Sequence, residues 1–230
     1  ACDHYGIDLV GGDTTSSQTG MCISITVIGE ADEEDIVYRN TARENDLICV
    51  SGNLGAAYMG LQLLEREKVV FKENPHAQPD FSGYEYILER QLKPEARMDI
   101  IQLLKEKGIK PTAMMDVSDG LSSEVLHICH DSGLGCNIYE EKIPIDYQTF
   151  KMAEELNMNA TVCALSGGED YELLFTTPLD AYDKLITMEE ISIIGHTCAK
   201  SEGYNLITKD GNSFELKAKG WVKFNPSEEK

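Results

Sequence analysis

Two carboxylates stand where an apolar segment runs into the start of a predicted helix, in MMDVSDGL at residues 114–121. Ligands of α/β proteins bind at strand carboxyl ends and helix N-termini. Asp116 and Asp119 would repel each other there without a cation, and Mg²⁺ takes one or two carboxylates together with phosphate oxygens and waters. Helix capping by Ser118 or Asp119 is the alternative, but it leaves Asp116 unexplained. The residues therefore favour a metal role.

Three further segments combine glycines with polar groups. LVGGDTT at 9–15 lets a backbone approach a phosphate closely and offers Asp13 to a cation, although an ordinary β-turn has the same composition. LSGGEDYE at 165–172 suits either a loop that closes over a ligand or a solvated acidic turn. SGNLGAA at 51–57 lacks the Walker A lysine and the G-x-G-x-x-G spacing, which favours a structural strand-to-helix turn.

Few other side chains offer chemistry. Arg39 suits either a bidentate grip on phosphate or a surface pair with the acidic residues around it. His127 and His130 lie one helical turn apart, but the sequence has no Cys/His cluster that completes a zinc site. Trp221, the single tryptophan, is typical of a core or lid anchor and could also stack on a flat ring.

The composition narrows the class of partner. The 230 residues carry 40 acidic and 20 basic side chains, a net charge of −20, which argues against nucleic acid and anionic membranes as partners. Phosphate substrates remain compatible, because Mg²⁺ bridges carboxylates and phosphates. Seven scattered cysteines without a C-x-x-C pair favour reduced thiols, so we expect a cytoplasmic protein. The apolar run at 47–64 is interrupted by polar residues, so we expect no membrane span.

Hydrophobic periodicity predicts a mixture of helices and strands. We expect strands at 21–28, 47–50, 113–115, 161–165, 172–176 and 191–194, and a hairpin of 205–208 with 213–216. We expect helices at 56–67, 84–92, 95–107, 121–130, 149–156 and 181–188, with an irregular segment at 68–83. On the helix over 121–130, the wheel places Glu124 on the polar side.

Together these motifs resemble the thiamine-monophosphate kinase family of the PurM-like ATP-binding superfamily. The resemblance is carried by LVGGDTT (9–15), Arg39, NDLICVSGNLGAAYMGLQLL (45–64), MDVSDGL (115–121), LSGGEDYELLF (165–175) and the late Gly220-Trp221. Their order and spacing match along nearly the whole chain. One departure is Thr41, which stands where the family often has Gly before the Ala that follows its Arg.

The resemblance implies an α+β, PurM-like fold. Residues 1–30 would be the end of the N-terminal domain, and residues 31–230 a complete C-terminal α/β layered domain. The family's preceding strands and further Mg²⁺-binding aspartates are absent, so we expect a fragment that is inactive by itself. The full-length protein would be a homodimer.

The family activity implied is transfer of the γ-phosphoryl group of ATP to thiamine monophosphate, giving thiamine diphosphate and ADP with the help of Mg²⁺. The acceptor is already an ionised phosphate, so no general base is expected. Carried over by motif, the contacts are Gly12, Asp13, Arg39 and Ser118 with ATP; Asp13, Asp116 and Asp119 with Mg²⁺; and Glu169 and Trp221 with the thiamine moiety, Asp170 being a less favoured neighbour.

Two alternatives stay open. Another PurM-like enzyme, of the selenophosphate or aminoimidazole-ribonucleotide synthetase type, would keep the fold and change the substrate. A non-catalytic scaffold would keep the fold alone, but it has no use for the carboxylates of Asp13, Asp116 and Asp119.

Overall fold

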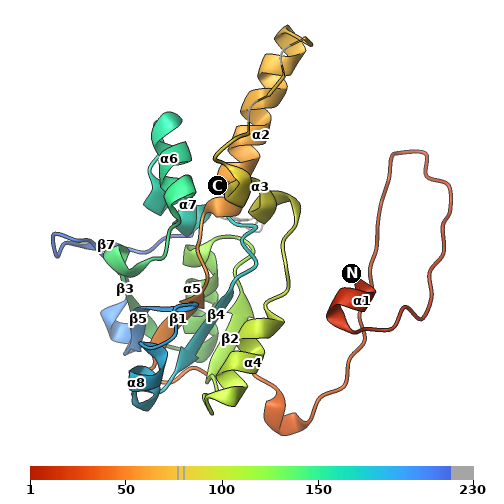
Figure 1. The fold of residues 1–230 in the computed structure, drawn as a ribbon. Coiled ribbons are helices and arrows are strands. Elements are labelled where there is room, and N and C mark those ends of the chain that lie inside the picture. The colour runs from red at the N-terminus through yellow and green to blue at the C-terminus, as the bar shows by residue number, and fades with distance from the viewer. Residues whose placement is uncertain (77, 80, 219–230) are drawn as a thin grey trace, which may run out of the picture. The chain divides into compact units, whose positions relative to one another are not determined.

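A seven-stranded sheet organises most of the chain (Figure 1). The computed structural model describes residues 1–76, 78–79 and 81–218. These fall into two units, Ala1–Ile36 and Val37–Lys230, and each is described by itself. The first unit contains α1 (Cys2–Tyr5) and a 3₁₀ turn (Glu33–Asp35) and is otherwise without regular structure.

The strands of the second unit pair in the order β2-β4-β1-β5-β3-β6-β7. Every neighbouring pair is antiparallel except β3 with β6, which is parallel. The strands are β1 (Leu47–Ser51), β2 (Ala113–Asp116), β3 (Gly135–Tyr139), β4 (Leu173–Thr177), β5 (Ile191–Cys198), β6 (Tyr204–Ile207) and β7 (Ser213–Glu215). The predicted hairpin at the C-terminal side is confirmed as β6–β7.

The helices of the second unit cover both faces of this sheet and form a group beside it (Figure 1). They are α2 (Ala56–Glu73), α3 (Glu85–Leu92), α4 (Met98–Glu106), α5 (Leu121–Ser132), α6 (Tyr147–Glu155), α7 (Ala160–Ser166) and α8 (Tyr182–Leu185), with 3₁₀ turns at Glu140–Lys142, Leu179–Ala181 and Lys200–Glu202. Among the described residues, none of these helices combines the length and apolar character that crossing a membrane requires. The fold is α+β, as predicted.

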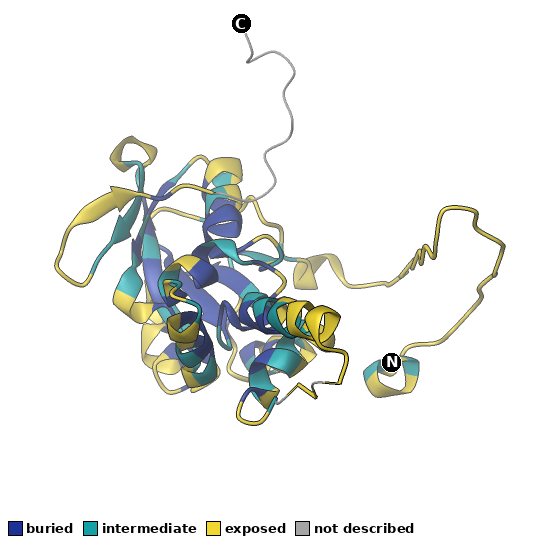
Figure 2. Cartoon of the chain, turned by 90° about the horizontal axis from the view of Figure 1, so that it is seen from above, coloured by how far each residue is buried: buried dark blue, intermediate teal, exposed yellow. Residues whose placement is uncertain are grey.

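Alternation along β1 divides the core between the two faces. Ile48 and Val50 pack with the apolar side of α5, whereas Leu47 and Cys49 pack with α4 and α8 on the other face. All five residues of β1 are buried, because a central strand of a sheet covered on both sides exposes neither face. Figure 2 shows the buried residues gathered in the sheet and the inner helix surfaces. A third apolar cluster joins α2, α3, α6 and α7.

Helix α2 is longer than the sequence pattern predicted. It continues to Glu73, so the expected irregularity of 68–73 is wrong. Lys68 pairs with Glu65 at 2.7 Å one turn away, and the long charged side chains of this stretch favour helix without burial. Val69 and Phe71 in the last turns are more than half exposed.

The strand predicted at 161–165 is wrong, because these residues belong to α7. Asn159 begins the helix by accepting the backbone N–H of Val162 at 3.0 Å. Ala160, Cys163 and Ala164 then lie on one buried face at helical spacing. A short apolar run fits both periods, and here the cap and the packing select the helix.

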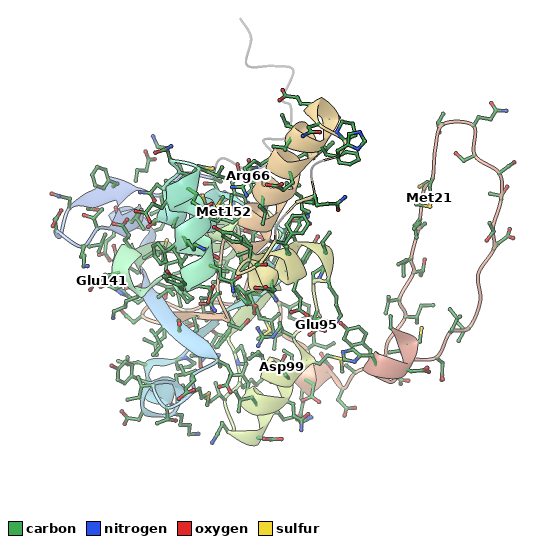
Figure 3. The ribbon with its side chains drawn as sticks, turned by 45° about the horizontal axis from the view of Figure 1, so that its top comes forward. Met21, Arg66, Glu95, Asp99, Glu141 and Met152 are labelled. Atoms are coloured by element: carbon green, nitrogen blue, oxygen red, sulfur yellow. The ribbon has the colours of Figure 1, made fainter. Side chains whose placement is uncertain are left out.

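The strand predicted at 21–28 is also wrong. The segment has no ladder partner in the described part of the chain, although its alternating residues Met21, Ile23, Ile25 and Val27 are apolar. All four are at least 72% exposed, and Met21 lies on irregular chain in Figure 3. A single extended segment without a neighbour cannot satisfy its backbone groups as a strand does.

A buried carboxylate begins α2. Asp170 is fully buried and accepts the backbone N–H groups of Gly55, at 2.7 Å, and Ala57, at 3.2 Å. Burial raises the pKa of Asp170 to about 6, against the opposing effect of these two hydrogen bonds. The folded chain therefore binds more protons than the unfolded chain between about pH 4 and 6. Protonation of Asp170 therefore stabilises the folded chain. This contribution to the unfolding free energy is at its maximum below about pH 4 and is lost as the pH rises through 6.

Replacing Asp170 by Asn should lower the unfolding free energy by about 1–2 kcal/mol at pH 5, because the amide nitrogen accepts no hydrogen bond, whereas both carboxyl oxygens can accept even when the group is protonated. The difference in unfolding free energy between the two proteins should become smaller as the pH rises from 5 to 7. Over this range the parent loses the stability that comes from protonation of Asp170, whereas the asparagine side chain does not titrate. Urea unfolding of both proteins and of the exposed-site control Asp183→Asn checks this. A difference that is constant or widens with pH would contradict it.

Candidate active site

Two loops lie side by side at one end of the sheet. β2 ends at Asp116, directly opposite Leu173, the first residue of the antiparallel neighbour β4. The aspartate loop, residues 116–120, therefore leaves the sheet where the Gly-Gly loop, residues 166–172, enters it. Segments far apart in the sequence are brought together by this one strand pairing.

Backbone hydrogen bonds continue the pairing beyond the strands. Three N–H groups donate across the two loops: Val117 to the carbonyl of Glu172 at 2.7 Å, Tyr171 to that of Val117 at 2.8 Å, and Glu169 to that of Ser118 at 2.7 Å. The positions of side chains in both loops are thereby tied to the sheet rather than left to free loop motion.

Two glycines permit the close approach of the loops. Gly168 has φ +71°, and a Cβ there would lie 2.6 Å from the carbonyl oxygen of Ser118. Gly120 has φ +106°, and a Cβ there would lie 2.8 Å from the carbonyl oxygen of Leu165. Both positions combine a left-handed backbone with a contact that leaves no room for a side chain.

The Gly-Gly loop holds two non-glycine residues in the left-handed region, Glu169 at φ 64° and Tyr171 at φ 52°. Such residues are energetically costly and cluster at functional sites. The Tyr171 hydroxyl donates to Oε2 of Glu169 at 3.0 Å. This hydrogen bond is the main cause that raises the pKa of Tyr171; burial and the charges of Glu169, Asp116 and Asp119 add to it.

The three carboxylates of the Gly-Gly loop have different environments. Glu169 is exposed, whereas Asp170 and Glu172 are buried. Glu172 forms ion pairs with Arg90, at 2.8 Å, and with Arg97. Arg90 also donates to the carbonyl oxygen of Asp170. Asp170 and Glu172 therefore support the loop, and Glu169 is the carboxylate that it presents outward.

Asp116 and Asp119 are exposed, and neither forms an ion pair within the described residues. Two unpaired carboxylates on one loop fit a hard cation such as Mg²⁺, which completes its shell with phosphate and water oxygens. Across the described residues, no group of three or more His, Cys, Asp or Glu side chains could hold a metal by itself. The donor set thus fits an ion shared with a phosphate ligand.

Glu124 lies on the first turn of α5 and is 1% exposed, so its predicted place on a polar helix face is wrong. Its Oε1 accepts the backbone N–H of Asp119 at 3.1 Å. Burial raises the pKa of Glu124 to about 7, and the charges of Asp119 and Asp116 add to the shift. An acidic residue in the turn after Asp-Gly was the only sequence signal for this contact.

The other predicted site residues lie in different parts of the chain. Ser118 is half-buried within the aspartate loop. Gly12 and Asp13 are exposed residues of the first unit, where Asp13 Oδ1 accepts the N–H of Thr14 at 2.8 Å. Trp221 lies outside the described residues.

Arg39 is not brought to the two loops. Its Nε lies 2.8 Å from Oδ2 of Asp131, near the C-terminal end of α5. The aspartate loop precedes the opposite end of that helix, about 15 Å away at 1.5 Å per residue. Arg39 thus pairs with an acidic residue that is distant in sequence and not with the acidic residues around it, as the pairing alternative had it. Its contact with ATP stays a prediction.

Surface hollows occur elsewhere in the second unit. One of ≈ 590 Å³ lies between α6 and α7, and another of ≈ 330 Å³ lies beside α8. Neither is lined by residues of the aspartate loop or the Gly-Gly loop.

Comparisons with known proteins agree with this architecture. Residues 43–203 match the family described as AIR synthase related protein, C-terminal domain. A thiamine-monophosphate kinase of Aquifex aeolicus is 34% identical over 97% of this chain, and one of Bacillus subtilis is 32% identical over 96%. The chain spans 65% of the length of each of these two relatives.

A solved structure described as AaThiL complexed with AMPPCP and TMP superimposes with a TM-score of 0.64 and 32% identity. The match covers 82% of this chain and 54% of that one. The predicted PurM-like fold is thereby confirmed. The chain belongs to the AIR synthase related family through its C-terminal domain, and it is a homologue of thiamine-monophosphate kinases.

Proposed function

We propose that the chain is the larger part of an ATP-dependent kinase that phosphorylates thiamine monophosphate to thiamine diphosphate. The observation that carries the proposal is the pair of exposed, unpaired carboxylates, Asp116 and Asp119, on a loop locked to the Gly-Gly loop. The named relatives and the relative that binds AMPPCP and TMP support the same reaction.

Phosphoryl transfer depends more on positioning of the two substrates and on neutralisation of their charge than on covalent catalysis by the protein. Two polyanionic phosphates must approach each other, and Mg²⁺, when bound, supplies the compensating positive charge. Asp116 and Asp119 would hold the ion, with Asp13 of the first unit as a further ligand. Gly12, Ser118 and Arg39 would contact ATP.

The thiamine moiety would lie against Glu169, with Trp221 stacking on its rings. The structure favours Glu169 over Asp170 because Glu169 is exposed, whereas Asp170 is buried against the start of α2. Tyr171, with its raised pKa, stays protonated at neutral pH and holds the Glu169 side chain through its hydroxyl. We expect the full-length protein to be a cytoplasmic homodimer and the 230 residues alone to be inactive.

Asp116→Asn should lower turnover by at least ~100-fold. The substitution removes one of the negative charges that would hold the cation, and without the cation the repulsion between the two phosphates is not neutralised. The assay supplies ATP, Mg²⁺ and thiamine monophosphate to the protein from the complete reading frame that contains this chain. Chromatography follows thiamine diphosphate, and Asp183→Asn on the exposed face of α8 is the control.

Three results have different meanings. Product that requires Mg²⁺ and is lost in Asp116→Asn supports the kinase. Mg²⁺-dependent ATP binding without formation of thiamine diphosphate would contradict the proposal that thiamine monophosphate is the substrate. It would favour a sister enzyme of the same superfamily. Neither product nor ATP binding would favour the scaffold.

Gly168→Ala should lower turnover at least ~10-fold, because the new Cβ would meet the Ser118 carbonyl and push the two loops apart. Gly211→Ala is a matched control: φ there is +78°, but nothing lies within 4 Å of the added Cβ. The control carries the same backbone strain, of order 1 kcal/mol, without the contact. Equal turnover in the two variants would show that the contact does not position the site.

A further inference from the structure

The hollow beside α8 lies at the end of the sheet opposite to the two loops. Leu47, the first residue of β1, lines this hollow and is paired with His196 of β5. Ser51, the last residue of β1, accepts the N–H of Leu173, which directly follows the Gly-Gly loop. The strand between Leu47 and Ser51 covers about 13 Å. The hollow is therefore separate from the candidate active site.

Aromatic rings make up much of the lining of this hollow. Tyr139 of β3, His196 of β5 and Tyr182 of α8 contribute rings, and Leu47 and Ile193 add apolar surface. Figure 1 shows α8 beside β5. The ring centroids of Tyr139 and His196 are 5.9 Å apart. The volume of ≈ 330 Å³ falls at the lower end of the volumes of small-molecule sites. Such a lining suits a small, flat ring.

A chain of hydrogen bonds fixes the proton of His196. Nδ2 of Asn205 donates to the carbonyl oxygen of Glu202 at 3.0 Å and to Oδ1 of Asn137 at 3.1 Å. Because a carbonyl oxygen only accepts, both amides are oriented, and Nδ2 of Asn137 donates to Nε2 of His196 at 3.2 Å. The ring then carries its proton on Nδ1 and donates to the Tyr139 hydroxyl at 3.4 Å. The proton of that hydroxyl is left for another acceptor.

The hollow combines hydrogen-bond donors with an absence of negative charge. None of the described residues that line it is acidic, although the chain carries 40 acidic side chains. Lys142 also lines it, and its Nζ lies 5.1 Å from the ring centroid of Tyr139. Within the described part of the chain Lys142 forms no ion pair. The ammonium group and the Tyr139 hydroxyl are thus both able to donate to an anionic group, and such charge-assisted hydrogen bonds are strong.

We propose that the hollow beside α8 is a second small-molecule site, which binds a flat ring compound that carries a carboxylate or a phosphate group. Lys142 and the Tyr139 hydroxyl bind the anionic group, and Tyr182 and the apolar residues contact the ring. The proposal uses no residue of the aspartate loop or the Gly-Gly loop. It is therefore independent of the proposed kinase activity.

The test measures binding of two anionic probes, benzoate and phenyl phosphate, to the protein from the complete reading frame. NMR titrations without Mg²⁺ give the Kd of each, and benzamide is the uncharged probe of matching shape. Lys142→Gln should weaken binding of the preferred anion at least ~10-fold, because a charged donor is lost. Tyr139→Phe, which loses a neutral donor, should weaken it about threefold.

Two matched variants carry the same chemical changes on exposed residues elsewhere. Lys209→Gln lies in the turn between β6 and β7, and Tyr147→Phe lies at the start of α6. Both should bind the anions like the parent. Lys142 is itself exposed, so its substitution leaves the core intact and decides the result even if Tyr139→Phe fails to fold.

The expected result is a Kd below about 1 mM for one of the two anions, at least ~10-fold lower than for benzamide. The anion that binds more tightly identifies the charged group as carboxylate or phosphate. Equal affinity for all three probes, no binding, or an affinity that Lys142→Gln leaves unchanged would overturn the proposal. None of these results alters the expected loss of kinase activity in Asp116→Asn.

Discussion

The site depends on a strand pairing that continues after its strands have ended. β2 and β4 pair up to Asp116 and Leu173, and the backbone bonds of Val117 with Glu172 and Tyr171 extend the register into two loops. These backbone hydrogen bonds tie the two loops, and therefore their side chains, to the sheet. The Gly-Gly loop therefore tolerates costly left-handed residues, because the surrounding hydrogen bonds leave it no cheaper conformation.

Much of the fold could be predicted because its signals are local. β1, β2, α5 and the last hairpin each carry a clear apolar period or turn sequence. α7 could not be assigned from its short apolar run, because such a run fits both a strand and a helix. The Asn159 cap and the packing of the buried face select the helix. β3 was missed because its partners, β5 and β6, are distant in sequence and its own residues include the polar Asn137.

The candidate site could be predicted only in its local part. The aspartate loop could be recognised from its own residues, two carboxylates and a glycine. Which carboxylates of the Gly-Gly loop are buried and which is exposed depends on partners that are distant in sequence. Glu172 is buried because Arg90 and Arg97, more than 70 positions earlier, meet it there; removing one member of such a buried pair typically costs about 3–5 kcal/mol. Glu124 was misplaced because a helical wheel does not show the loops that cover a helix start.

The uncharged segment at 21–28 has a consequence for the behaviour of the chain in solution. Exposed, alternating and rich in β-branched residues, it is the kind of sequence that associates with copies of itself. The net charge of −20 opposes such encounters by repulsion between molecules. That repulsion is screened beyond roughly 10 Å at 0.1 M salt. Colloidal stability is thus governed by ionic strength: dilute buffers keep the chains apart, and concentrated salt removes the barrier to precipitation.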